Sequence, residues 1–140
     1  DAKNTDVLKR IKEITGEHEV RYMEHTAGGC DITVESAGIG TTFAQCLEAL
    51  KPESGTAIIA AAYEGQFPIE PNMIIFKYMQ VLGSMGYTDQ EAGEAMDLIG
   101  SGLIDRDILI SHRLPLAEAP KGFELQADPH ASVKVMIVMS

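Results

Sequence analysis

Hydrophobic residues at the start of the chain recur at a helical spacing. They are Val7, Leu8, Ile11 and Ile14. Because these positions share one face, the sequence predicts a short helix that Asn4 or Thr5 caps and that Gly16 ends. The next stretch, "EHEVRYMEHTAGG" over residues 17–29, is polar, mixed in charge and closed by two glycines. This composition predicts a loop or an irregular hairpin.

A strand, a helix and a second strand follow. The β-branched stretch "CDITVES" (residues 30–36) predicts a strand. The helix after it is capped by Thr41 or Thr42 and ends at Lys51-Pro52, because proline disfavours a helical predecessor. Its apolar stripe consists of Phe43, Cys46, Leu47 and Leu50. The continuous apolar run "TAIIAAA" (residues 56–62) is typical of a buried parallel strand, so the segment predicts a βαβ unit.

The second half of the chain predicts further alternation of helices and strands. A short helix carries Pro71 in its first turn and leads into a strand over residues 78–83. Thr88 and Glu91 have the spacing of a capping box, at the start of a helix that ends near Gly100. Its predicted buried face consists of Ala92, Ala95, Met96 and Ile99. Three segments complete the pattern: a strand in "DILISHRLPL" (107–116), a helix in "AEAPKGFELQA" (117–127) strained by Pro120, and a strand in "KVMIVM" (134–139).

Composition narrows the class of protein. A chain of 140 residues is one domain by length, and 45% hydrophobic with 23% charged residues is typical of a globular fold. The net charge of −10 would repel a phosphate backbone, so we expect no nucleic-acid partner. Cys30 and Cys46 show no redox or metal spacing and are expected to be reduced thiols. No apolar run is long enough for a membrane span, and we expect a cytoplasmic protein.

The stretch "DITVESAGIGTTFAQ" (31–45) raises the possibility of a dinucleotide-binding turn. Gly38 and Gly40 match the first two glycines of the Gly-x-Gly-x-x-Gly fingerprint, and Glu64 could bind the ribose. The third position is Phe43, whose side chain would occupy the place where helix and strand pack closely. The match to the fingerprint is therefore weak.

A resemblance that runs along most of the chain places residues 31–45 elsewhere in a nucleotide-binding fold. The succession "DITVESAG", "ALKPESGTAIIAA", "QVLGSMGYTDQEAGEAMDLIGSGLID" and "ILISHRLPLAEAPKGFE" resembles the C-terminal half of the zinc-dependent alcohol dehydrogenases, in the medium-chain dehydrogenase/reductase family, near its sorbitol and butanediol dehydrogenase branches. The most specific motifs are "SHRLPLAEAPKGFE" and "LGSMGY". The resemblance covers about Asn4 to Val138, interrupted by residues 17–29, which are longer than the short glycine-rich link of the family.

The resemblance implies an α/β fold, part of a doubly wound, Rossmann-like parallel sheet of three strands with flanking helices. Residues 1–107 would be the second half of an NAD(P)-binding domain, and residues 108–140 a helix and strand that return to the substrate domain. The glycine fingerprint, the zinc ligands and most of the proton relay of such enzymes would lie outside this chain. We therefore expect no catalytic and no metal-binding residue here, and no turnover by this chain alone.

In such enzymes the loops after the fourth, fifth and sixth strands border the nicotinamide. The resemblance assigns those loops to residues 36–38, 60–62 and 84–87. The implied cofactor-binding residues are Ser36, Ala37, Gly38, Ala60, Ala61, Ala62, Ser84, Met85 and Tyr87. Small residues at the carboxyl ends of parallel strands suit this role because they let a ring approach the backbone.

The resemblance also implies partners. The parent enzyme would transfer a hydride between NAD or NADP and an alcohol or polyol, with zinc polarising the oxygen. The strand over Tyr78–Gly83 would form a sheet edge that pairs with a second copy in a homo-oligomer. The opposite edge, at "DITVES", would be bare, and we expect an isolated chain to aggregate or swap. An alternative remains: a non-enzymatic nucleotide-binding or association module that uses the Gly38-Gly40 turn.

Several residues have a structural and a functional interpretation. A metal site at His18, Glu24, His25 and Cys30 is disfavoured because the spacing matches no standard site. Cys46 is favoured as a buried thiol over a nucleophile, and His112 and Arg113 as linkage over contact with cofactor or substrate. Glu35 is favoured as a carboxylate bonded to backbone donors over a group in proton transfer. Met73, Met79, Met85 and Met96 are expected in the core or, at the third strand, in a subunit contact.

Overall fold

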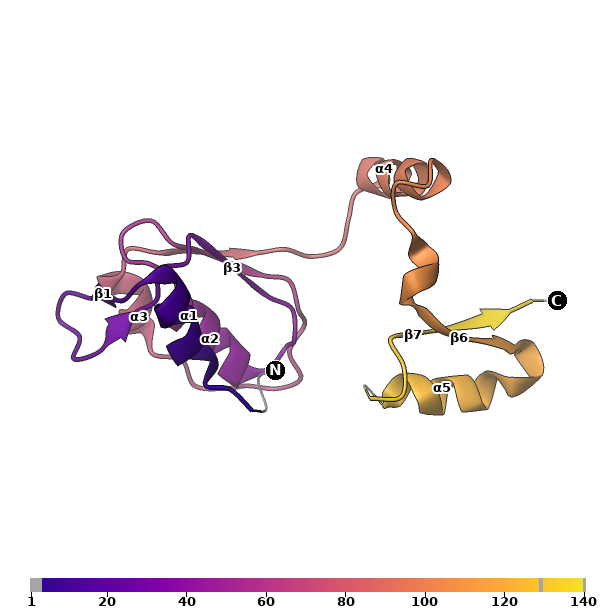
Figure 1. The fold of residues 1–140 in the computed structure, drawn as a ribbon, viewed down its shortest axis with the longest axis horizontal. Coiled ribbons are helices and arrows are strands. Elements are labelled where there is room, and N and C mark those ends of the chain that lie inside the picture. The colour runs from indigo at the N-terminus through magenta and orange to yellow at the C-terminus, as the bar shows by residue number, and fades with distance from the viewer. Residues whose placement is uncertain (1–3, 129, 140) are drawn as a thin grey trace. The chain divides into compact units, whose positions relative to one another are not determined.

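The computed structural model describes residues 4–128 and 130–139. It divides the chain into two compact units, Asp1–Gly86 and Tyr87–Ser140, which are indigo to pink and salmon to yellow in Figure 1. The boundary expected after residue 107 separates the NAD(P)-binding domain of a whole enzyme from its substrate domain, and it stays a prediction. No helix in the described ranges has both the length and the apolar character that crossing a bilayer requires.

The first unit begins with helix α1 (Val7–Thr15). The predicted cap at Asn4 or Thr5 is wrong: Asp6 caps the helix, and its carboxylate accepts a hydrogen bond from Lys9 N at 3.1 Å. Gly16 ends the helix, as predicted. Residues 17–29 then form the irregular hairpin that the sequence left open, with β1 (His18–Glu19) and β2 (Thr26–Ala27) paired antiparallel.

A parallel sheet of three strands forms the centre of this unit, as the predicted fold class requires. The strands β3 (Ile32–Glu35), β4 (Thr56–Ile59) and β5 (Gln80–Gly83) lie in that order. They are in register from end to end, since Glu35 pairs with Ile59 and Ile59 with Gly83. All three strands therefore end at one edge, which is the place where open α/β sheets bind ligands.

Helix α2 (Gly40–Ala49) connects β3 to β4 and contacts both strands. Phe43, Leu47 and Leu50 are buried in the core with Ala57, Met73 and Met79, so the predicted apolar stripe is largely confirmed. The predicted cap is wrong, because Ile39 occupies the cap position without a side-chain hydrogen bond. The Thr42 hydroxyl lies in the first turn instead and hydrogen-bonds the Glu35 carboxylate.

Helix α3 (Pro71–Phe76) carries proline in its first turn, as predicted, and leads into β5. Lys77, directly after α3, is the largest fully buried side chain of the described residues. Its ammonium donates to the carbonyl oxygens of Leu47 and Glu48 at the end of α2. A buried cation thus satisfies carbonyl groups that a helix end leaves without partners.

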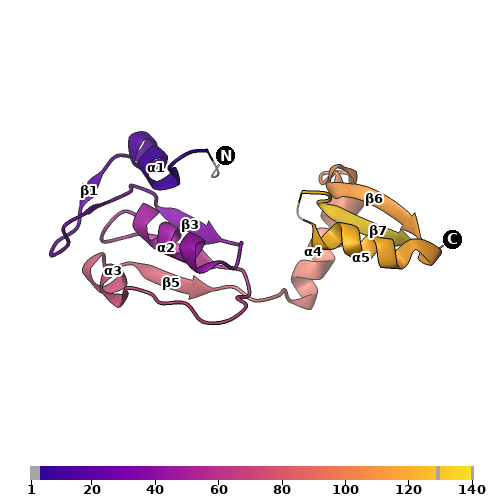
Figure 2. The same cartoon turned by 90° about the horizontal axis from the view of Figure 1, so that it is seen from below.

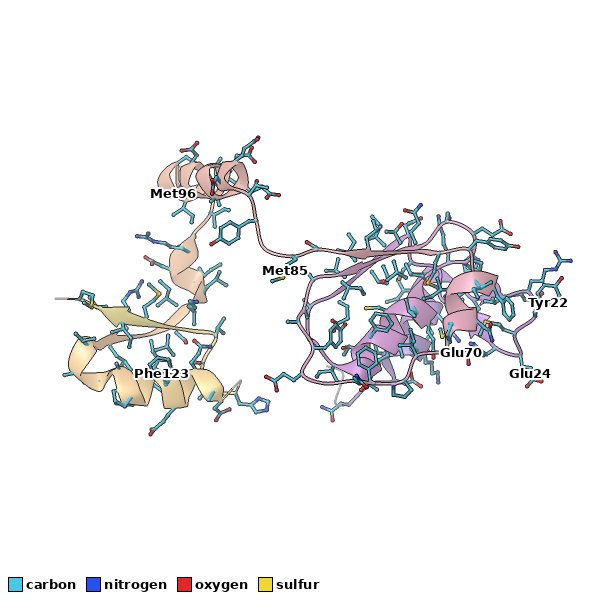
Figure 3. The ribbon with its side chains drawn as sticks, turned by 180° about the vertical axis from the view of Figure 1, so that it is seen from behind. Tyr22, Glu24, Glu70, Met85, Met96 and Phe123 are labelled. Atoms are coloured by element: carbon cyan, nitrogen blue, oxygen red, sulfur yellow. The ribbon has the colours of Figure 1, made fainter. Side chains whose placement is uncertain are left out.

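The second unit begins with α4 (Asp89–Gly100). Its predicted capping box is confirmed: Glu91 N donates to Thr88 Oγ1 at 3.3 Å, and Thr88 N to Glu91 Oε2 at 2.7 Å. The predicted buried face is wrong, because α4 has no buried residue, and the exposed Met96 is labelled in Figure 3. Helical spacing marks one side of a helix, whereas burial needs an element packed on that side.

The chain then forms a one-turn helix η1 (Arg106–Leu109) and a parallel pair of strands, β6 (Ile110–Pro115) and β7 (Lys134–Val138). The 3₁₀ turn η2 (Leu116–Glu118) and helix α5 (Ala119–Ala127) connect them, and α5 lies along the pair (Figure 2). The predicted strain at Pro120 is wrong, since α5 begins at Ala119 and proline is tolerated in a first turn.

Candidate functional site

Three loops meet at the carboxyl edge of the sheet in the first unit. The ladder continues past the strands, because Ala60 N donates to the Glu35 carbonyl and Ser84 N to the Ile59 carbonyl, both at 2.8 Å. The structure therefore brings together residues 36–38, 60–62 and 84–85, which lie far apart in the sequence. Tyr87 is an exposed residue of the second unit.

Gly38 closes the gap between the first two loops. Its φ is +70°, a conformation that favours glycine, and a Cβ atom added to it would lie 2.4 Å from the Ala62 carbonyl oxygen. The backbones of the two loops thus approach more closely than any side chain at residue 38 would allow. This contact fixes the spacing between the loop after β3 and the loop after β4.

The Glu35 carboxylate, at the end of β3, is buried beneath these loops and is only 1% exposed. It accepts hydrogen bonds from Ala37 N at 3.0 Å, from Gly38 N at 3.1 Å and from Thr42 Oγ1 at 2.7 Å. The Tyr63 hydroxyl donates the fourth. The structural role predicted for this carboxylate, bonded to backbone donors, is confirmed. Two side-chain donors, Thr42 and Tyr63, add to it.

These contacts set the protonation of the Glu35–Tyr63 pair. Burial alone would raise the pKa of Glu35, but the bonds from Tyr63, Thr42 and the two backbone amides hold that pKa below its ordinary value. Burial and the neighbouring Glu35 charge raise the pKa of the Tyr63 hydroxyl. Glu35 therefore stays ionised and Tyr63 stays a donor at neutral pH.

Tyr63 is held from its other side by two phenylalanine rings. Its ring centroid lies 6.2 Å from that of Phe43 on α2 and 5.1 Å from that of Phe67. Phe67 in turn covers Gly40, where an added Cβ would lie 2.7 Å from the ring. The aromatic cluster of Phe43, Tyr63 and Phe67 thus packs the loop after β4 against the start of α2.

Comparison with known proteins decides the family. Residues 1–101 match the family model described as "Zinc-binding dehydrogenase", which is more than half of the chain. This chain belongs to the zinc-binding dehydrogenases. The match covers all of the first unit and α4 of the second.

Individual relatives agree with this dehydrogenase assignment. The chain is 26% identical over 137 residues to (R,R)-butanediol dehydrogenase of Bacillus subtilis, covering 97% of this chain and 36% of that protein. It is 27% identical over 126 residues to L-arabinitol 4-dehydrogenase of Hypocrea jecorina, covering 88% and 33%. The chain thus spans about a third of the length of these relatives.

Solved structures of dehydrogenases have the same fold. The crystal structure of 2R,3R-butanediol dehydrogenase from Bacillus subtilis superposes with a TM-score of 0.78 at 25% identity, covering 99% of this chain and 37% of that one. A putative zinc-binding dehydrogenase from Sinorhizobium meliloti 1021, solved bound to NADP, gives a TM-score of 0.74 at 29% identity, covering 99% and 38%.

The described residues show which kinds of group this chain could hold. At the carboxyl edge the exposed side chains of Ser36, Ala37, Ala60, Ala62 and Ser84 are short, which leaves the loop backbones open to a flat ring. Met85, labelled in Figure 3, is 96% exposed beside them. Within the described ranges, no three His, Cys, Asp or Glu side chains are placed to hold a metal ion, the suggested set at His18, Glu24, His25 and Cys30 included.

The remaining candidates of this dehydrogenase chain have local partners. Cys46 is half-buried, and desolvation raises the pKa of its thiol, which opposes a nucleophilic role. Arg113 forms an ion pair with Asp107 at 2.6 Å, and His112 Nδ1 lies 3.2 Å from Ser111 Oγ. Met73 and Met79 are buried as expected, whereas Met85 and Met96 are exposed.

Sequence reasoning missed Tyr63 and Thr42 as parts of the site. Tyr63 follows the alanine run of the second loop, and its role depends on a carboxylate 28 residues earlier. The available signal was one of position: an acidic residue at the end of one parallel strand and a phenol just beyond its neighbour lie at the same edge.

Proposed function

We propose that this chain forms the nicotinamide side of the cofactor site in an NAD(P)-linked dehydrogenase that acts on an alcohol or polyol. The observation that carries the proposal is the meeting of three short-residue loops at the carboxyl edge of β3, β4 and β5. Support comes from the zinc-binding dehydrogenase family and from the butanediol and arabinitol dehydrogenases among the relatives. The expected contacts are those of residues 36–38, 60–62 and 84–85, and the assignment of Tyr87 stays a prediction from the family resemblance.

In this role the chain's own residues bind and orient the ring. A bound nicotinamide supplies hydride transfer. The loops after β3 and β4 offer backbone groups for the carboxamide, and their short side chains let one face of the ring lie against the chain. We propose that the zinc ligands of the parent enzyme lie outside this chain; in the described residues no three His, Cys, Asp or Glu side chains are placed to hold a metal ion.

Either NAD or NADP is compatible with this edge. The Sinorhizobium meliloti relative was solved with NADP, which favours neither cofactor for this chain, because the two differ at the adenosine ribose and not at the nicotinamide. We propose that the adenosine half binds outside these loops and that the 140 residues alone bind either cofactor weakly and catalyse no turnover.

A titration of the ¹⁵N-labelled chain with oxidised nicotinamide mononucleotide tests the site. We expect amide shifts at millimolar probe confined to the three loops, and matched titrations with adenosine monophosphate should leave those loops unchanged. Shifts scattered over both units, or strongest at the start of α2 with adenosine monophosphate, would contradict the proposal. Calorimetry that found micromolar NADH binding would contradict the expected weakness.

We further propose that β5 is an association edge. In the described residues β5 pairs only with β4, and the exposed Leu82 and Tyr78 lie on it or just before it. An unpaired strand edge is a template for a second copy. Leu82→Lys is expected to shift sedimentation toward the monomer, and an unchanged distribution would argue against this edge.

A further inference from the structure

The buried charge of Glu35 connects three separate segments. Its carboxylate receives backbone bonds from the loop after β3, a hydroxyl bond from Thr42 on α2 and a phenol bond from Tyr63 beyond β4. It is one of two buried charged side chains of the described residues, and Lys77 is the other. Burying a carboxylate is costly unless its oxygens are fully hydrogen-bonded, as they are here.

We propose that Glu35 is a positioning residue of the cofactor site, which holds the first and second loops in one arrangement and places a negative charge behind the nicotinamide. This inference rests on the proposed function. Ala37 and Gly38 are both bonded to the carboxylate and both belong to the loop that would contact the ring.

The geometry explains how one side chain could control two loops. Gly38 lies against the Ala62 carbonyl, so a displacement of either loop is transmitted to the other. Removing the carboxylate would leave two amides and the Tyr63 hydroxyl without their acceptor, while the Thr42 hydroxyl would keep the Ile39 carbonyl oxygen, 2.8 Å away. We expect the two loops to separate and the backbone surface for the ring to be lost.

The charge has an effect that a neutral support would lack. An oxidised nicotinamide ring is positively charged and a reduced ring is neutral. A carboxylate in a site of low dielectric attracts the positive ring more strongly than it would in water. Glu35 is therefore expected to favour the oxidised over the reduced cofactor, whereas a residue that only shaped the loops would affect both alike.

The experiment compares the wild-type chain with Glu35→Gln, Tyr63→Phe and the control Asp31→Asn. Asp31 is an exposed carboxylate just before the same strand, ion-paired with Lys51 away from the loops. Dissociation constants for oxidised and reduced nicotinamide mononucleotide come from amide shift titrations. Glu35→Gln should weaken the oxidised form several-fold more than the reduced form, and Asp31→Asn should change neither.

A second measurement needs no cofactor. Amide exchange at Ala37 and Gly38 should accelerate in Glu35→Gln, because the neutral oxygen that glutamine retains is a weaker acceptor than a carboxylate oxygen. The Tyr63 hydroxyl should ionise at lower pH than in wild type. Tyr63→Phe removes only the hydrogen bond from the Tyr63 hydroxyl to Glu35 and keeps the ring packed against Phe43 and Phe67. It therefore provides a test even if Glu35→Gln fails to fold. It should accelerate exchange at the same two amides.

The outcomes separate this inference from the proposed function. If wild type binds the probes but Glu35→Gln binds both forms with unchanged affinity, the positioning role is overturned and the proposed site stands. Unchanged amide exchange and Tyr63 ionisation in Glu35→Gln would overturn it as well. If wild type shows no loop shifts with either probe, the proposed function fails, and the role of Glu35 toward a cofactor fails with it.

Discussion

Lys77 caps the end of a helix with an ammonium group whose charged form is disfavoured by burial. Its side chain is 1% exposed and caps the end of α2, yet burial lowers its pKa to about 8 from an ordinary value of 10.5. A helix C-terminus favours a cation, whereas burial disfavours one. In Lys77 the cost of burial exceeds the benefit of the cap, because the pKa moves downward.

This balance predicts a pH dependence. Between about pH 8 and 10.5 the folded chain has lost the Lys77 proton while the unfolded chain still binds it, so the free energy of unfolding rises with pH. The slope from one group is at most about 1.4 kcal/mol per pH unit. We expect wild type to gain stability relative to Lys77→Met across this window, measured by urea unfolding. Cys46 and Tyr63 titrate in both chains, so their contributions cancel in the difference between the two free energies of unfolding. A difference that did not change with pH would contradict the buried ammonium.

Gly40 separates the two interpretations of the glycine turn. Its missing side chain makes room for the Phe67 ring, and the Gly38 amide is already bonded to Glu35, so no phosphate is needed to explain either glycine. A buried carboxylate accepts the loop amide bonds that a nucleotide phosphate accepts in a true fingerprint.

We therefore expect Gly40→Val to destabilise the chain by about 1–3 kcal/mol through overpacking against Phe67. Thermal unfolding followed by circular dichroism checks this. Gly93 in α4 is the matched control, since an added Cβ there meets nothing within 4 Å. Gly93→Val should leave stability nearly unchanged. A stable Gly40→Val chain that had lost nucleotide binding would support the alternative module instead.

At the scale of an element, α4 depends on its own sequence more than on packing. It has no buried residue in its unit, so its capping box and helix propensity contribute most of the local stability. The Glu91 carboxylate is part of this cap, and its bonds from Thr88 hold its pKa below the ordinary value.

Thr88→Ala should therefore unravel the first turn of α4, at a cost of about 1 kcal/mol. We expect faster amide exchange over residues 89–92 and reduced helical circular dichroism. Thr88→Ser retains the hydroxyl and is expected to restore most of the protection. If Thr88→Ala behaved like wild type, the capping box would not be what stabilises this helix.

At the scale of the whole molecule, the exposed edge at β3 is the main liability. In the described part of the chain β3 pairs only with β4, and Ile32 and Val34 are 60% and 58% exposed. A hydrophobic, unpaired strand is a template for association. The groove beside it, between α1 and α2, is lined by Val7, Ile11 and Val34 together with other apolar and polar residues.

We expect the isolated chain to associate as its concentration rises, in size-exclusion chromatography with light scattering. Val34→Lys should shift it toward the monomer, because a lysine on an edge strand opposes pairing. Arg10→Lys, on the exposed side of α1, serves as the control that keeps the charge and leaves the edge intact. A wild-type chain that stayed monomeric and unfolded cooperatively would contradict this prediction.

Local chemistry was readable from the sequence wherever neighbours in the chain decide the structure. The Thr88-Glu91 capping box, the stop at Gly16 and Pro71 in a first turn depend on residues a few positions apart, and all are confirmed. The chain-wide order of motifs was also sufficient for the family.

Tertiary structure decided everything that depends on contacts between distant residues. The sequence marked Glu35 as a carboxylate at a strand end, but only the fold brings Tyr63 onto it and places Gly38 against Ala62. The same limit explains the wrong burial in α4, since periodicity shows which residues share a face but not whether another element covers that face. By itself the sequence determined the elements and their order, because these depend on short-range periodicity and turn chemistry. The three-loop site depends on the register of β3, β4 and β5, which long-range packing sets.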